Sequence, residues 1–381
     1  IGLTESYEGE GYDRKNLKIP QNQEELLAEI AETVGRDHIA AISFGGAPMD
    51  FSFEKNVGAI LHMYLGGQAV GESVADLISG EVNPSGKLAE TIPFSEKDTP
   101  AWRYFAPPND DVEYRESIFV GYRYYETFHV PVKYPFGYGL SYTSFSYSEL
   151  NVPEVYSGGK IQIGFKIKNI GKVSGAEIAQ LYVCPIESDV IRSHIELKGF
   201  QKIYLHPGEE KEVILELDER SFSVYDVEKK AFSMLSGKYQ ICIGASVHDL
   251  QLKANMEVVG NSYFSNERAL FPDYFREQPH GMEISAEQFY QLLGGEPKHD
   301  KEKKRGEYTV YDSYQDVVNV SMFGKFVRGV VHIGLKIILR GKSERDPAFK
   351  MVKMGVEEGN LEGLIATSGG IATPKLIDML V

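Results

Sequence analysis

The sequence is poor in cysteine, in positive charge and in histidine pairs. Two cysteines in 381 residues exclude a disulfide-stapled scaffold and a cysteine-rich metal site. The 9 histidines are scattered, without a pair at metal-ligand spacing, so we expect no metal and no other cofactor. With 40 basic against 55 acidic residues, the formal charge is −15. Such a chain repels a phosphate backbone, which argues against a nucleic-acid partner.

An uninterrupted apolar run of membrane-spanning length is also missing. Residues 313–340 have a long apolar helical pattern, but it carries Lys325, Arg328 and Lys336. A bilayer would not tolerate three cations there, so we expect no membrane partner. Such a helix would pack on its own chain or on a second copy, which leaves homo-oligomerisation open. No secretory signal opens the chain, and with the low cysteine count we expect a cytoplasmic protein.

The length predicts two or three domains, at roughly 150 residues each. Residues 1–95 alternate short apolar runs with helical patterns: a helix over 21–34, a buried strand over 39–44, an apolar run over 57–65, a helix over 71–78 and a short strand over 87–92. Residues 1–3 resemble the end of one more strand. Continuous apolar strands between helices predict an α/β sandwich around a mostly parallel sheet, with its sites on the loops after the strand carboxyl ends.

The later parts of the chain have other patterns. Residues 96–141 are rich in proline, tyrosine and aspartate with little periodicity, which predicts an ordered linker. Over 142–258, apolar residues alternate with polar ones in several short runs separated by turn signals. This pattern predicts an all-β sandwich, in which Cys184 and Cys242 are buried thiols. We expect residues 259–381 to form a partly helical C-terminal extension.

The loop that follows residues 1–3 holds the strongest chemical signal. Glu10 lies between Gly9 and Gly11, and further carboxylates lie at positions 5, 8 and 13. Flanking glycines let a backbone adopt unusual dihedrals, and crowded carboxylates raise one another's pKa, as a general acid near neutrality requires. An acidic surface turn would have the same composition, so residue types alone leave the alternative open.

A second glycine-rich segment, residues 80–88, superficially resembles a phosphate-binding loop. It has five residues rather than four between its glycines, and Leu88 stands where serine or threonine would hold magnesium. We therefore interpret it as a structural turn.

Five motifs, in chain order, together resemble the C-terminal half of glycoside hydrolase family 3, the β-glucosidase and β-xylosidase family. They lie at residues 9–14 (GEGYDR), 83–93 (NPSGKL followed by TIP), 119–125 (FVGYRYY), 134–143 (YPFGYGLSYT) and 197–209 (LKGF followed by PGE). The resemblance implies that the sandwich is fibronectin type III-like. It also implies a retaining mechanism, in which two carboxyl groups lie about 5–5.5 Å apart across the glycosidic bond.

By the same resemblance, Glu10 is the general acid/base and Tyr12 is an aromatic wall for the leaving-group sugar. Glu8 lies outside the matched core, but its charge would raise the pKa of Glu10. The family's aspartate nucleophile belongs to an N-terminal (β/α)8 barrel that these residues do not include. Asp13, Asp50, Asp110, Asp111 and Asp226 lie in no matching nucleophile motif, so none is assigned.

Two functions follow as expectations. The first is the acid/base half of an exo-acting retaining β-glycosidase, a β-glucosidase before a β-xylosidase. Its partners would be a β-glycoside substrate and a barrel polypeptide that carries the nucleophile. The alternative is a non-catalytic carbohydrate-binding or interaction module that kept the fold. An intact Gly-Glu-Gly-Tyr loop favours the enzyme, because a binding module has little use for it.

Overall fold

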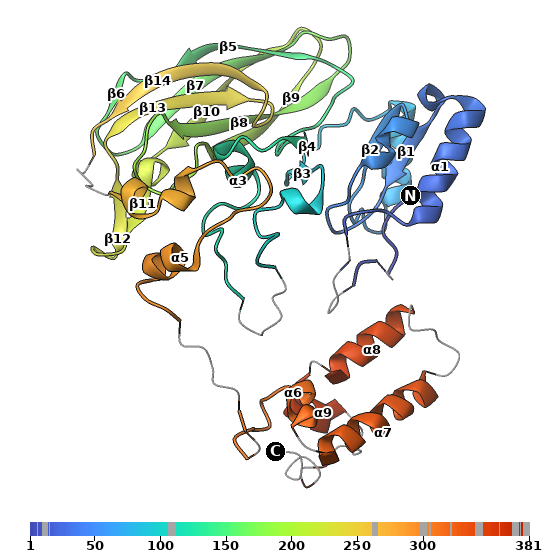
Figure 1. Cartoon of the computed structure of the whole chain (residues 1–381). Coiled ribbons are helices and arrows are strands. Elements are labelled where there is room, and N and C mark those ends of the chain that lie inside the picture. The colour runs from blue at the N-terminus through green and yellow to red at the C-terminus, as the bar shows by residue number, and fades with distance from the viewer. Residues whose placement is uncertain are drawn as a thin grey trace. The chain divides into compact units, whose positions relative to one another are not determined.

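The computed structural model describes residues 1–5, 7–9, 14, 16–105, 112–260, 266–297, 303–304, 306–320, 322–339, 346–357, 359–367, 373 and 375. Its contacts divide the chain into two compact units, Ile1–Gly66 with Lys298–Val381, and Gly67–Pro297. In order, the chain forms a small mixed α/β region, a β-sandwich and a helical tail, which confirms the predicted fold class (Figure 1). Of the helices described, none is long and apolar enough to cross a bilayer.

Residues 1–66 form a parallel sheet. Strand β1 (Ala40–Ser43) pairs in parallel with β2 (Ala59–His62). On the other side of β1 lies the segment 1–3, whose Leu3 amide donates to the Phe44 carbonyl at 3.0 Å, so the predicted strand end is confirmed. Helix α1 spans Gln21–Val34 as predicted, and the short helices η1 (Arg36–His38) and η2 (Ser52–Asn56) precede and follow β1. The side chain of Gln23 on α1 exchanges two hydrogen bonds with the Gly2 backbone, which covers the outer edge of this sheet.

The next segment begins with helix α2 (Val70–Ser79), which Gly80 ends in a left-handed conformation at φ 82°. The predicted strand over 87–92 is wrong except at its end, since only β3 (Ile92–Pro93) is a strand, antiparallel to β4 (Val132–Tyr134). Leu88 pairs its backbone instead with Gly137 and Tyr138, at 2.8 Å in both directions.

The segment that superficially resembled a phosphate loop is a structural turn, as interpreted. Its Asn83 side chain accepts hydrogen bonds from Ser141 Oγ at 3.0 Å and from the Tyr142 amide at 2.8 Å, and donates to the Ser174 carbonyl at 3.0 Å. Lys87 forms a largely buried ion pair with Glu177 at 3.0 Å. These contacts tie two motifs of the sequence, 83–88 and 134–143, to the start of the sandwich, which gives both a structural role.

The sandwich is built from two antiparallel sheets, apart from one short parallel pair. One sheet has the order β10-β7-β5 and the other the order β6-β14-β13-β8-β9. The predicted alternation is confirmed on β7, where Ile163, Phe165 and Ile167 are at most 1% exposed and belong to one core. The strands are β5 (Phe145–Asn151), β6 (Val155–Tyr156), β7 (Ile161–Asn169), β8 (Gly175–Pro185), β9 (Glu196–Leu205), β10 (Glu210–Leu217), β13 (Gly237–Gly244) and β14 (Leu250–Val258).

Smaller elements complete this unit. Helix η4 (Glu219–Phe222) precedes the hairpin of β11 (Ser223–Asp226) and β12 (Ala231–Met234). Cys184 and Cys242 are free, buried thiols, as predicted. Helix α3 (Tyr122–Thr127) of the linker shares an aromatic core with η5 (Pro272–Phe275) and α5 (Ala286–Leu293), while η3 (Glu96–Asp98) and α4 (Glu267–Leu270) are the other short helices of this unit. The described part of the linker around α3 therefore packs against a segment about 150 residues later in the chain.

The helical tail corrects one prediction. The single helix expected over 313–340 is divided into α6 (Tyr314–Asn319) and α7 (Met322–Ile338). The two helices pack closely, because a Cβ at Gly324 would lie 2.5 Å from the Val318 carbonyl oxygen. Only glycine allows α6 and α7 to approach so closely at this point. The chain therefore turns between the two helices, although the apolar pattern continues through the turn. Helices α8 (Pro347–Glu357) and α9 (Leu361–Thr367) complete the tail, with Leu361 in the core of α6.

A buried carboxyl group in the linker gives a pH-dependent prediction. Glu116 is 4% exposed, its Oε2 has no hydrogen-bond partner within the part of the chain that the structure describes, and burial raises its pKa. A carboxyl whose pKa is raised in the folded state loses stability as pH rises from its unfolded pKa, about 4.5, through the folded pKa. We expect E116Q to abolish this loss, so that the variant gains about 1 kcal/mol over the wild type at pH 8 and nothing near pH 4.

Thermal unfolding of both proteins between pH 4 and 8 measures this difference. The exposed Glu257 on β14 supplies the control, since E257Q should follow the wild type at every pH. A constant offset between E116Q and the wild type across the range would contradict the prediction.

Candidate active site

The predicted catalytic loop leaves the parallel sheet at its carboxyl edge. The segment 1–3, β1 and β2 run in one direction, so the loops after Leu3, Ser43 and His62 leave from the same edge. Open α/β sheets bind ligands at this edge. The segment that leads into the predicted loop thus leaves the sheet at this edge.

Two residues that bracket the loop are anchored at this edge. Both carboxylate oxygens of Glu8 accept a hydrogen bond from the Gly46 amide, at 3.0 and 2.9 Å. Arg14 donates through Nη2 to the Pro48 carbonyl. Since Gly46 and Pro48 directly follow β1, the chain on either side of residues 9–13 is attached to one short segment.

Arg14 also brings a partly desolvated cation to the loop. Burial lowers its pKa, while the negative charge of Glu8 raises it. Its Nη1 is buried and has no hydrogen-bond partner among the described residues. The guanidinium of Arg14 is positively charged and has one donor to spare, so it can donate a hydrogen bond to a further acceptor.

The predicted catalytic residues themselves, Glu10 and Tyr12, lie outside the described residues, and so does Asp13. Their roles therefore stay predictions. Among the other aspartates, Asp50 accepts a hydrogen bond from the Ser52 amide at 3.0 Å. Asp226 is buried, and its ion pair with Lys229 at 2.9 Å lowers its pKa. Both have structural partners, whereas Asp110 and Asp111 also lie outside the described residues.

Sequence reasoning missed an aromatic cluster at the same edge. Ser43 Oγ lies 2.9 Å from His62 Nδ1. The centroid of the His62 ring lies 4.0 Å from that of Tyr64, with the two rings tilted by 56°, and the His62 ring meets Phe51 edge-on at 5.3 Å. Burial lowers the pKa of His62, so the imidazole is neutral near pH 7. The only available signal was a histidine inside an apolar run, and the parallel register that places it opposite Ser43 is a tertiary feature.

Comparison with known protein families shows to which family the chain belongs. Residues 1–142 match the glycosyl hydrolase family 3 C-terminal domain, and residues 177–247 match a fibronectin type III-like domain. The chain belongs to glycoside hydrolase family 3. Residues 9–14 lie within the first match, and the LKGF motif lies within the second, so the resemblance stated from the sequence is confirmed.

Characterised family 3 relatives share about 260 residues with the chain. The thermostable β-glucosidase B of Acetivibrio thermocellus is 44% identical over 259 residues, which are 68% of this chain and 34% of the relative. An exo-α-(1→6)-L-arabinopyranosidase of Bifidobacterium breve is 37% identical over 261 residues, again 68% of this chain and 34% of the relative. The chain thus spans about a third of the curated family 3 relatives that it matches.

Solved family 3 structures agree with this relationship. A β-glucosidase of Bifidobacterium adolescentis superimposes with a TM-score of 0.66 at 37% identity, covering 69% of this chain and 39% of that one. The β-glucosidase of Kluyveromyces marxianus in complex with glucose gives a TM-score of 0.63 at 35% identity, covering 68% of this chain and 31% of that one. The chain corresponds to the C-terminal portion of family 3 β-glucosidases.

Proposed function

We propose that this chain carries the general acid/base, Glu10, of a retaining exo-β-glycosidase that releases terminal β-D-glucosyl residues. The observation that carries the proposal is the Gly-Glu-Gly-Tyr loop, bracketed by the Glu8–Gly46 and Arg14–Pro48 contacts at the carboxyl edge of a parallel sheet. A proton donor must be held within hydrogen-bond reach of the glycosidic oxygen, and these two contacts attach the chain before and after Glu10 to the edge of the sheet.

In the proposed mechanism, an aspartate on a (β/α)8 barrel outside these 381 residues attacks the anomeric carbon. Glu10 donates its proton to the departing oxygen as the glycosidic bond breaks, which leaves a covalent glycosyl-enzyme. Glu10, now ionised, takes a proton from water, whose oxygen displaces the aspartate and releases the sugar. Tyr12 stacks on the apolar face of the leaving-group sugar.

The residues beside Glu10 support these steps. The charges of Glu8 and Arg14 lie on either side of it in sequence, and they oppose each other in their effect on its pKa. The amide of Gly46 holds Glu8 at the strand edge, so Glu8 acts as a positioning residue rather than as a proton donor. In this proposal, the partners of the chain are a β-glycoside substrate and the barrel that carries the nucleophile. The two free thiols are compatible with a cytoplasmic enzyme.

A chimeric enzyme tests the proposal. The whole of this chain replaces the matching third of the Acetivibrio thermocellus β-glucosidase, which is 44% identical over 259 residues, so that the aromatic core shared by the linker and residues 271–289 stays intact. We expect the chimera to hydrolyse p-nitrophenyl β-D-glucoside, and this chain alone to be inactive, because one carboxylate of two gives no covalent route.

The same assay separates the alternatives. Faster hydrolysis of the β-D-xyloside or the α-L-arabinopyranoside than of the glucoside would change the substrate but keep the mechanism. A chimera that folds and binds sugar but hydrolyses none of the three would contradict the proposal and favour a binding module.

A further inference from the structure

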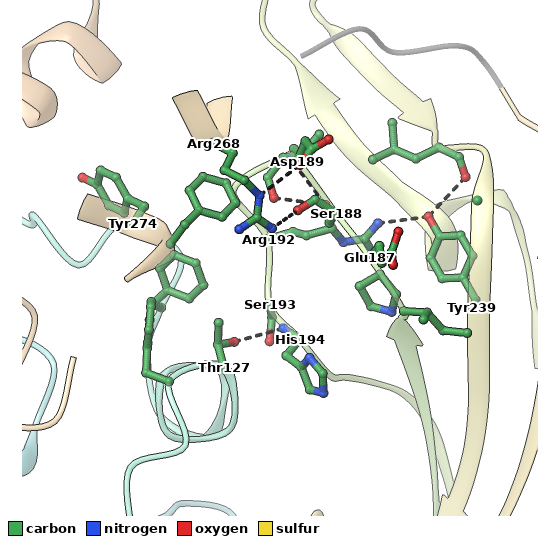
Figure 2. A pocket seen from close by; sticks show the side chains of 18 of the residues that line it. Thr127, Glu187, Ser188, Asp189, Arg192, Ser193, His194, Tyr239, Arg268 and Tyr274 are labelled. Atoms are coloured by element: carbon green, nitrogen blue, oxygen red, sulfur yellow. Dashed lines mark hydrogen bonds and ion pairs between the residues drawn. The ribbon is translucent and has the colours of Figure 1, made fainter. Parts of the chain in front are cut away.

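A large cavity opens in the unit of residues 67–297. Its volume is about 1390 Å³, and all of its lining residues lie between positions 119 and 277. The walls are the end of α3, the loop 186–195 between β8 and β9, the turn before β13, and the segment 268–277 (Figure 2).

The loop 186–195 is held rigidly from two sides. The Ile191 amide donates to Glu267 Oε2 at 2.6 Å, and Arg268 pairs with Asp189 at 3.0 Å. At its other end, the His194 amide donates to Thr127 Oγ1 at 2.9 Å. A wall fixed in this way is a preformed surface, so a ligand would not have to order it.

Arg192 in this loop is a buried cation. Its side chain lies against the cavity with 7% exposure, and its Nη1 donates to the Tyr239 hydroxyl at 3.0 Å (Figure 2). Its Nε is buried, and no described residue accepts a hydrogen bond from it. Within the described part of the chain no carboxylate pairs with Arg192, whereas the neighbouring Arg268 and Arg276 pair with Asp189 and Asp273.

A buried guanidinium without a counter-charge is energetically costly, and folded proteins rarely retain one. The planar fork of a guanidinium matches a carboxylate or phosphate group, to which it donates two parallel hydrogen bonds. An oxyanion in the cavity would supply the missing charge. Arg192 thus indicates that a ligand of this cavity carries a carboxylate or phosphate group.

The volume of the cavity and its other lining residues indicate what it can hold. The volume of about 1390 Å³ lies above the usual range of small-molecule sites, about 300–1,000 Å³, so a ligand of sugar size fits inside. The half-buried ring of Phe275 lines the cavity together with Ser188 and Ser236, whereas the rings of Phe119, Tyr239 and Tyr274 are at most 2% exposed. An aromatic ring and polar side chains in one cavity suit a sugar ring, which has apolar faces and polar edges.

We propose that this cavity binds a sugar-sized ligand with a carboxylate or phosphate group, and that Arg192 pairs with that oxyanion. The inference does not depend on the role of Glu10, because the cavity and its lining belong to residues 119–277.

Isothermal titration of the full chain at low salt tests the site with D-glucuronate, glucose 6-phosphate, glucose and inorganic phosphate. We expect at least one acidic sugar to bind about tenfold or more tightly than glucose and than inorganic phosphate. The acidic sugar that binds more tightly shows whether the oxyanion is a carboxylate or a phosphate. Equal binding of glucose, or no saturable binding of either acidic sugar, would overturn the proposal.

Variants of Arg192 separate binding from folding. R192Q should weaken the acidic sugar at least tenfold, and R192K should weaken it less, since it keeps the charge and loses the fork. The matched control is R220Q, which removes the same charge from an exposed residue that does not line the cavity and should leave binding unchanged. Unaltered binding in a folded R192Q would overturn the assignment.

Stability without ligand gives a second readout. If Arg192 is retained for a ligand, R192M should unfold at a higher temperature than the ligand-free wild type, because the uncompensated charge is gone. It should also lose the upward shift that the acidic sugar gives the wild type. A purely structural arginine would give the opposite result, with R192M less stable and no ligand-induced shift in the wild type.

Discussion

Replacing Glu10 by glutamine should lower kcat/KM on cellobiose about 10²- to 10⁴-fold in the chimeric enzyme, the usual contribution of a general acid/base. Glutamine keeps the size of the side chain but has no proton to exchange. The loss should be far smaller for the first, glycosylation step on 2,4-dinitrophenyl β-glucoside, because a good leaving group needs little protonation. Stopped-flow release of dinitrophenol measures this step apart from the slow release of glucose.

Two further measurements distinguish a general acid/base from a residue that only supports the structure. The variant should lose the alkaline limb of the pH profile of kcat/KM, since that limb reports the titration of the acid. In E10A, azide should restore turnover and yield a glucosyl azide with retained configuration, because a small anion can replace the water that lacks its base.

Glu8 provides the matched control. E8Q removes the same charge two residues away, but it keeps a carbonyl oxygen that can accept from the Gly46 amide. We expect E8Q to retain activity within about threefold, because it still positions the loop. Equal losses in E8Q and E10Q, or equal losses of E10Q on cellobiose and on the dinitrophenyl substrate, would exclude the assigned role of Glu10.

The largest stability effect should come from Asn169, a fully buried residue at the end of β7. Its side-chain oxygen accepts from Thr143 Oγ1 at 2.7 Å and from the Gly171 amide at 3.0 Å. Its nitrogen donates to the carbonyls of Val173 and Leu205, at 2.8 and 3.1 Å. All four hydrogen bonds of one amide are thus satisfied inside the protein.

In N169D, two carbonyl oxygens would face a buried carboxylate in place of donors. We expect the variant to lose about 4 kcal/mol of unfolding free energy at pH 8, as for other buried, uncompensated charges. The loss should be smaller near pH 5, because burial raises the pKa of the new carboxyl and its protonated form can donate one hydrogen bond. Urea unfolding at the two pH values measures the difference.

Asn255 on β14 of the same sandwich is the control, since it is exposed and accepts from Gln240 Nε2 at 3.2 Å. N255D should change the unfolding free energy by less than about 0.5 kcal/mol. Hydrogen exchange would show whether the N169D effect is confined to the amides of β7 and β8. An N169D protein as stable as N255D would mean that the buried amide contributes little.

Local pattern was enough for much of the fold. The apolar period that defines helix α1 and the alternation on β7 are properties of neighbouring residues, and the structure has both elements at the predicted positions. Gly80 ends its helix because it adopts a positive φ at little cost. Five motifs together identified the family, since each of them lies in one continuous stretch of the sequence.

Tertiary structure alone decided where distant residues meet. No local pattern places Glu8 on Gly46, Ser43 on His62 or Asn83 on Tyr142, because each pair is joined by the register of strands or by a loop that folds back. The same holds for Arg192, whose sequence context is an ordinary polar loop. Its missing counter-charge is visible only once burial is known, because the cost of an unpaired charge depends on how much water is removed around it.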